Sequence, residues 1–205
     1  MSHTRLDQLS DGIFAIVMTL LVFEIRIPDP GLIANNQDLW LVMKNLGPHL
    51  ASYILSFTLL FTYWRAHHFF VSIYAKNVDA RLSNINAVFF LLIALVPFSS
   101  FLLGRFSDFE LAIAIFGIHT ILIGAVLYLM RNYVLYSEHI RNPEISPRDI
   151  HGSTIRTLAP IVFALVAIPV SFISTSYSIA IFTFAVLFNL SPSSTRLFEK
   201  IYKMK

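Results

Sequence analysis

The sequence predicts an all-α integral membrane protein with six transmembrane helices. Hydrophobic residues make up 56% of the 205 residues and charged residues only 13%, and the mean hydropathy is +0.69. Soluble domains carry about 25% charged residues, so this composition argues against an ordinary soluble fold. Six apolar stretches, each close to the roughly 20 residues that a helix needs to cross a bilayer, indicate the number of helices.

The six spans are predicted to form a single domain, residues 1–205. By hydrophobic length they lie at residues 7–27, 49–74, 82–104, 108–131, 154–173 and 175–191. A turn-forming stretch after the first span leads into a predicted short helix at residues 39–46. Residues 132–152 are polar and are predicted to form a cytoplasmic linker, because Pro143 and Pro147 interrupt any long helix.

Basic residues are distributed unevenly between the two sides of these spans. Twelve of the fifteen Lys and Arg residues lie in the flanks on one side, and only Arg26, Lys44 and Arg105 lie on the other. Basic residues accumulate on the cytoplasmic side of membrane proteins. We therefore expect a multi-pass protein of the cell (plasma or inner) membrane with both termini in the cytoplasm.

Several functional classes find no support in the sequence. The chain has no cysteine, which excludes disulfides, thiolate nucleophiles and cysteine metal sites. No hydrolase, zinc-protease or phosphate-binding motif is present, and no RNA- or DNA-binding motif accompanies the basic excess. We expect no enzymatic activity, no cofactor, no bound metal and no nucleic-acid partner.

The first span contains polar residues, which are costly in hydrocarbon and usually face protein or water. It opens with Ser10-Asp11-Gly12 and carries Thr19 near its middle. At about 100° per residue, Ile16, Leu20 and Phe23 share one stripe of the helix, while Asp11 points almost the opposite way. Taken alone, such a stripe is typical of ordinary helix packing.

The same stretch resembles the first-helix signature of the transmembrane protein 175 family of potassium channels. The resemblance covers Arg5, then Leu9-Ser10-Asp11-Gly12, Ala15-Ile16 and Thr19-Leu20-Leu21, with Leu9 where the family has Phe. It implies a homotetramer in the lipid bilayer, with a central potassium pore lined by the first helix. Ile16 would form the narrowest ring, with Thr19, Leu20 and Phe23 further out. A single six-span repeat implies a prokaryotic source.

A narrow ring of aliphatic side chains differs from a filter of carbonyl groups. It offers no ligands, so an ion passes largely dehydrated or through a transiently wetted constriction. Potassium releases its water more readily than sodium, which predicts a preference for potassium rather than strict selection. No Thr-Val-Gly-Tyr-Gly filter loop is present in the sequence.

A second motif, Tyr63-Trp64 followed by His67-His68, resembles the family's second-helix pattern. The resemblance implies a network that holds the pore helix in place. Its members would be Arg5, Ser10 and Asp11 on the first helix and Trp64, His67 and His68 on the second. Adjacent histidines point about 100° apart on a helix and cannot readily share a metal ion. Anchoring at the membrane interface is the alternative role for this motif.

A third element, with Leu82-Ser83-Asn84 early and Pro97-Phe98 late, also resembles the family and predicts a kink at the proline. His119 is expected to be a packed or hydrogen-bonded residue of the fourth span. Glu24 lies at the outer end of the first helix. A ring of Glu24 carboxylates could concentrate cations at the pore mouth, or Glu24 could pair with Arg26 or Lys44.

Another functional class remains open on this sequence. A proton-coupled secondary transporter, or a proton-conducting channel, could use the ionisable residues Asp11, His67 and His68. Transporters usually show paired interrupted helices and internal repeats, and neither is evident in the sequence. A potassium-preferring channel is therefore the first hypothesis.

Overall fold

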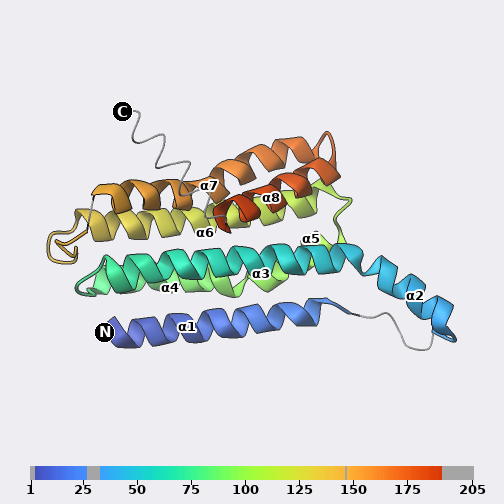
Figure 1. Ribbon diagram of the computed structural model, residues 1–205, viewed down its shortest axis with the longest axis horizontal. Coiled ribbons are helices and arrows are strands. Elements are labelled where there is room, and N and C mark those ends of the chain that lie inside the picture. The colour runs from blue at the N-terminus through green and yellow to red at the C-terminus, as the bar shows by residue number, and fades with distance from the viewer. Residues whose placement is uncertain (1–2, 27–32, 146, 191–205) are drawn as a thin grey trace.

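The computed structural model is a bundle of helices that run roughly along one axis (Figure 1). It describes residues 3–26, 33–145 and 147–190. The helices are α1 (His3–Leu20), α2 (Asn36–Asn45), α3 (Gly47–His68), α4 (Ala80–Ala94), α5 (Val96–Arg105), α6 (Glu110–Tyr136), α7 (Pro147–Ser171) and α8 (Thr175–Leu190). A 3₁₀ helix, η1 (Leu21–Glu24), continues α1, and a π-helix, η3 (Phe69–Ile73), continues α3.

The connections between helices gather at the two ends of the bundle. The start of α1, the α3–α4 connection and the α6–α7 connection lie at one end, and α2, the α5–α6 connection and the α7–α8 turn lie at the other (Figure 1). Arg5, Lys76, Arg81 and Arg141 belong to the first end. This is the end that the distribution of basic residues predicts to be cytoplasmic.

The long helices are apolar enough to cross a membrane. In the described part of the chain, residues His3–Glu24, Ala80–Arg105 and Glu110–Tyr136 meet this requirement by length and composition, and Thr157–Ser171 and Thr175–Asn189 are shorter apolar helices. α3 has 22 residues but carries more polar side chains along its length. These helices are those of a multi-pass membrane protein, although fewer reach full span length than the six expected from hydropathy.

Several observed helix bounds differ from those expected. The predicted span 82–104 is broken at Leu95 into α4 and α5, because Pro97 cannot donate a backbone hydrogen bond in a continuous helix. The predicted linker 132–152 is shorter, since α6 continues to Tyr136 and α7 begins at Pro147. Proline is well tolerated in the first turn of a helix, which explains why Pro147 begins one rather than interrupting it.

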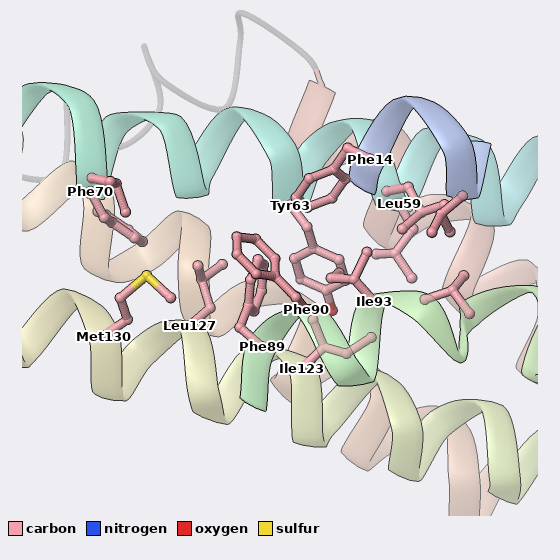
Figure 2. Close-up of a cluster of buried hydrophobic side chains, with 14 of the residues drawn as sticks. Phe14, Leu59, Tyr63, Phe70, Phe89, Phe90, Ile93, Ile123, Leu127 and Met130 are labelled. Carbon is pink, nitrogen blue, oxygen red and sulfur yellow. The ribbon is translucent and has the colours of Figure 1, made fainter. Parts of the chain in front are cut away.

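The core lies between α1, α3, α4 and α6 and is rich in aromatic side chains. Phe14, Tyr63 and Phe89 are fully buried there, and Figure 2 shows side chains of all four helices converging on this region. The Tyr63 hydroxyl donates a hydrogen bond to the carbonyl oxygen of Thr120, 3.2 Å away, so the polar end of this buried ring has a partner.

α6 and α7 approach each other closely along two glycines of α6. A Cβ atom at Gly117 would lie 2.7 Å from Ile168 Cγ1, and one at Gly124 would lie 2.6 Å from Ile161 Cγ1. Both distances are far shorter than any real van der Waals contact. The two glycines are therefore required by packing, because the branched isoleucine side chains occupy the space of the missing Cβ atoms.

Asp79 caps α4 at the end predicted to be cytoplasmic and joins it to the α6–α7 connection. Its carboxylate accepts hydrogen bonds from the Leu82 backbone N–H at 2.7 Å, from the Tyr133 hydroxyl, and from His139 at 3.2 Å. Burial raises the pKa of Asp79, but these hydrogen bonds outweigh it and hold the pKa below its ordinary value. The adjacent backbone is also paired, since Lys76 N–H donates to the Ile140 carbonyl oxygen.

Candidate functional site

α1 has one buried face and one exposed face in the single chain. Its buried residues recur every three or four positions and are Leu6, Ser10, Phe14 and Val17. The opposite side is apolar and exposed along what we call the Ile16 stripe: Leu9, Ile16, Leu20 and Phe23. Ile16 is 60% exposed and Phe23 is 67% exposed. An apolar surface of this kind on a helix in the bundle indicates contact with lipid or with further copies of the chain.

Thr19 lies beside the Ile16 stripe and is exposed. Its hydroxyl donates to the backbone carbonyl oxygen of Ile16 at 2.8 Å, one turn back on the same helix. The hydroxyl proton is therefore used in this backbone hydrogen bond, while lone pairs of the hydroxyl oxygen remain available on the exposed side. Thr19 can offer an acceptor to a passing cation or water molecule, but not a donor.

Glu24, predicted to lie at the pore mouth or to pair with Arg26 or Lys44, is not part of the Ile16 stripe. A 3₁₀ helix turns about 120° per residue, so side chains three apart are eclipsed, and Glu24 follows the direction of the buried Leu21. The carboxyl group interacts with the Ser100 hydroxyl of α5 and with the charge of Arg26. Its Oε2 atom is buried and has no hydrogen-bond partner within the described part of the chain.

A hydrogen-bonded chain crosses from α1 through α3 to α4. The hydroxyl of Ser10 is 3.1 Å from His67 Nδ1, and His67 Nε2 is 2.6 Å from Asn86 Oδ1. Asn86 Nδ2 donates to the Leu82 carbonyl oxygen, so its Oδ1 is the acceptor and His67 Nε2 carries the proton. Ser10 then donates to Nδ1, and a neutral imidazole satisfies every partner.

The ring of His67 is also held by aromatic side chains. It is only 1% exposed and stacks on Phe89 with ring centroids 5.2 Å apart and an interplanar angle of 6°. Phe14 and Phe90 flank it at 6.4 and 5.4 Å. The buried face of α1 is therefore fixed by one polar chain inside an aromatic cage, which leaves little freedom for the helix to rotate about its axis.

Asp11 binds a different residue of α3. Its Oδ1 accepts a hydrogen bond of 2.8 Å from Trp64 Nε1, and the indole ring stacks on His68 at 6.2 Å. Arg5 is exposed on the side of the Ile16 stripe and forms no hydrogen bond or ion pair with the described residues. In the single chain, Asp11 is thus held by Trp64 and not by Arg5 or His67.

A third contact set lies one turn closer to the start of α1 and was not foreseen. Asp7 Oδ1 accepts from the Ser72 hydroxyl at 2.8 Å, and His68 Nδ1 is 3.0 Å from the same hydroxyl oxygen. His3 lies 3.3 Å from Asp7 and 2.5 Å from the carbonyl oxygen of Val71. Asp7 stands four residues before Asp11 on the same face, and this spacing is the signal that could have identified it.

The partner of His67 on α4 is Asn86, which the sequence analysis did not single out, and not Asn84 of the third-helix pattern. Asn84 is exposed, whereas Asn86 is fully buried against His67. Positions two apart on a helix point about 200° apart, so only one of the two can face α3. As for metals, no group of three or more potential ligands comes together among the described residues.

Known proteins similar to this chain are ion channels. The sequence model of a family described as the endosomal/lysosomal potassium channel TMEM175 matches residues 5–97. A potassium channel of Chryseobacterium sp. is 25% identical over 193 residues, which are 94% of this chain and 94% of that protein. A potassium channel of Streptomyces collinus is 24% identical over 202 residues, which are 94% of this chain and 95% of that protein.

A solved structure shares the fold over nearly the whole chain. The crystal structure of a lysosomal potassium-selective channel TMEM175 homologue from Chamaesiphon minutus matches with a TM-score of 0.78 and 26% identity, and covers 92% of this chain and 96% of that one. The endosomal/lysosomal proton channel TMEM175 of Mus musculus is 26% identical over 144 residues, which are 70% of this chain but only 28% of that protein.

Proposed function

Because the chain belongs to the TMEM175 family of ion channels, we propose that it forms a potassium-preferring cation channel with a pore lined by α1. The channel is a homotetramer in the cell membrane with both termini in the cytoplasm. Four copies of α1 surround one axis, and the Ile16 stripe of each copy faces it. The proposed activity is ion passage across lipid and not a chemical reaction, in keeping with the channel names of the similar proteins.

The observation that supports this proposal is the contrast between the two faces of α1. One face is anchored by the Ser10–His67–Asn86 chain and by Asp11–Trp64. The other is an exposed apolar stripe next to the acceptor oxygen of Thr19. A helix anchored in this way presents the same side chains to its neighbours in every subunit, as a pore of fixed width requires.

Ile16 forms the constriction in this proposal. Four isoleucine side chains around an axis leave a passage without ligands, which gates by dewetting and admits an ion only after much of its water is removed. Sodium holds its water more tightly than potassium and crosses more slowly. Leu20 and Phe23 form wider rings on the outer side, so the main barrier lies at Ile16.

The test is a reversal potential in reconstituted bilayers with potassium on one side and sodium on the other. Ile16→Asn supplies oxygen atoms and retains water in the constriction, so current persists or rises while the preference for potassium falls. Phe23→Asn is the matched control in a wider ring beyond Leu20 and leaves the preference largely unchanged. If only the Phe23 change abolishes the preference, the constriction is not at Ile16.

A second test uses the natural lack of cysteine. Silver ions applied to Ile16→Cys channels bind the new thiolates in the pore and block the current. Ile118→Cys is the control, because Ile118 is an exposed residue of α6, a helix that does not line the proposed pore. If silver blocks neither variant, Ile16 does not line the pore.

A proton-conducting channel is the second candidate, and it is favoured by the proton-channel name of the vertebrate relatives. Asp7, Ser72 and His68 are in hydrogen-bond contact, and the stacked Trp64 continues this row to Asp11. This row lies away from the Ile16 stripe. A current that follows the pH gradient, survives replacement of potassium and is lost in Asp7→Asn with Asp11→Asn would favour the second candidate.

A further inference from the structure

The apolar segment that begins at Ala80 breaks at Leu95, and a histidine of α6 contacts both sides of the break. His119 Nε2 is 3.0 Å from the carbonyl oxygen of Leu92 in α4, and His119 Nδ1 is 2.8 Å from the Ser99 hydroxyl in α5. A carbonyl oxygen only accepts, so Nε2 carries the proton, and Nδ1 accepts from Ser99. One neutral imidazole thus binds one helix with each nitrogen.

Pro97 explains why the helix breaks but not which way the second segment points. It stands in the first turn of α5, where its missing N–H is not needed, and the Leu95 N–H turns back to Leu92. A break of this kind leaves the angle between the two segments free to vary unless something else holds it. α6 packs on both segments, and from α6 His119 forms a hydrogen bond with each of them across the break.

α5 in turn lies against the outer end of the pore helix. It packs on η1 and on α3. The Ser52 hydroxyl of α3 donates to the Ser100 carbonyl oxygen at 2.6 Å, and the Ser100 hydroxyl interacts with the Glu24 carboxyl group of η1. α5 is therefore, together with α3, one of the two helices on which η1 packs.

We propose that His119 is a positioning residue that fixes the α4–α5 bend and, through α5, the place of η1 and Phe23 at the outer end of the pore. The first part concerns the bend alone. The second part rests on the proposed channel function.

Three substitutions separate the two hydrogen bonds. Gln has an amide nitrogen near the position of Nε2 and keeps the bond to Leu92, whereas Asn has an amide oxygen near the position of Nδ1 and keeps the bond to Ser99. Leu keeps neither. The Ser99 hydroxyl also lies 3.1 Å from the Val96 carbonyl oxygen, so it retains an acceptor when the histidine is removed and the fold is preserved.

The bend is measured by electron paramagnetic resonance between spin labels on Val88→Cys and Phe106→Cys, one on each side of the break. Both positions are exposed, and the chain has no other cysteine. Labelled subunits are diluted with unlabelled ones so that distances within a subunit dominate. His119→Leu is expected to shift and broaden the distance distribution, with His119→Gln and His119→Asn in between. Ile118→Leu, the neighbouring control, is expected to match the unmodified chain.

The pore is tested on the same variants by single-channel conductance and by the potassium preference. His119→Leu is expected to change the conductance in proportion to the change in the bend. His119→Gln and His119→Asn, which each keep one hydrogen bond, are expected to change the conductance less. An unchanged distance distribution in His119→Leu overturns the proposal. A changed bend with unchanged conductance overturns its second part. If the unmodified chain carries no current, the channel function fails while the distance measurement still decides the role of His119.

Discussion

The hydrogen bond between Ser10 and His67 predicts a measurable coupling between α1 and α3. Ser10→Ala removes the donor to His67 Nδ1, and His67→Phe removes the ring nitrogens while keeping an aromatic ring in the cage. Both side chains are buried, at 3% and 1% exposure, so water does not replace the lost partner. The two variants and their combination form a double-mutant cycle.

The expected magnitudes follow from which groups lose a partner. Ser10→Ala leaves only Nδ1 without a partner, whereas His67→Phe leaves the Asn86 oxygen unsatisfied and frees Ser10 to bond its own helix. Each change leaves one buried polar group without a partner, which costs about 1–3 kcal/mol. His67→Phe also removes two hydrogen bonds where Ser10→Ala removes one, so it is the more destabilising change. For hydrogen bonds between helices of a membrane protein, double-mutant cycles give coupling energies of about 0.6 kcal/mol on average and at most about 1.7 kcal/mol. We expect a coupling energy of about 1 kcal/mol.

The assay is reversible unfolding of the purified protein in mixed micelles, followed by circular dichroism at several denaturant concentrations. The control cycle pairs Ser10→Ala with Thr62→Val. Thr62 is buried on α3, but its hydroxyl bonds the Thr58 carbonyl oxygen of its own helix, so this pair is expected to be additive. A Ser10–His67 coupling no larger than that of the control pair would show that the bond does not hold α1 to α3.

Three further changes test packing and electrostatics. Gly124→Ala places a Cβ atom against Ile161 and is expected to cost about 1–3 kcal/mol of unfolding free energy by overpacking, whereas Gly47→Ala, with open space around it, costs far less. The lowered pKa of Asp79 means that its hydrogen bonds stabilise the fold above about pH 4, the ordinary pKa of the group. Amide protection factors at the start of α4, which correct for the intrinsic pH dependence of exchange, should therefore fall only as the pH drops below that value, and should lose this dependence in the Asp79→Asn variant. Phe14→Ala empties a fully buried site and is expected to cost about 3–5 kcal/mol in the same unfolding assay.

Much of the candidate site could be read from local patterns. The spacing of Leu6, Ser10, Phe14 and Val17 identifies one face of a helix, and the residues between them define the exposed stripe. The family motif in the first predicted span identified the chain as a channel before any geometry was known. Trp64 and His67 bond Asp11 and Ser10 of α1, whereas His68 is linked to α1 only through Ser72 and Asp7.

Other parts of the site depend on irregular backbone that periodicity cannot show. α1 ends in a 3₁₀ turn, so a wheel drawn at about 100° per residue does not give the direction of Glu24, which follows that of the buried Leu21. The break at Leu95 divides a stretch that hydropathy treats as continuous. The composition of a segment does not reveal a 3₁₀ turn or a break in a helix, because neither changes how apolar the segment is.

The sequence by itself determined that this chain is helical, that it enters a membrane, and to which family of channels it belongs, since these depend on composition, local spacing and a short motif. Only the tertiary structure decided which polar groups meet: Asn86 and not Asn84 at His67, Trp64 and not Arg5 at Asp11, and His119 across the α4–α5 break. The physical reason is that periodicity shows the faces of one helix but not its rotation and register against another. Buried hydrogen bonds depend on both to within a fraction of an ångström.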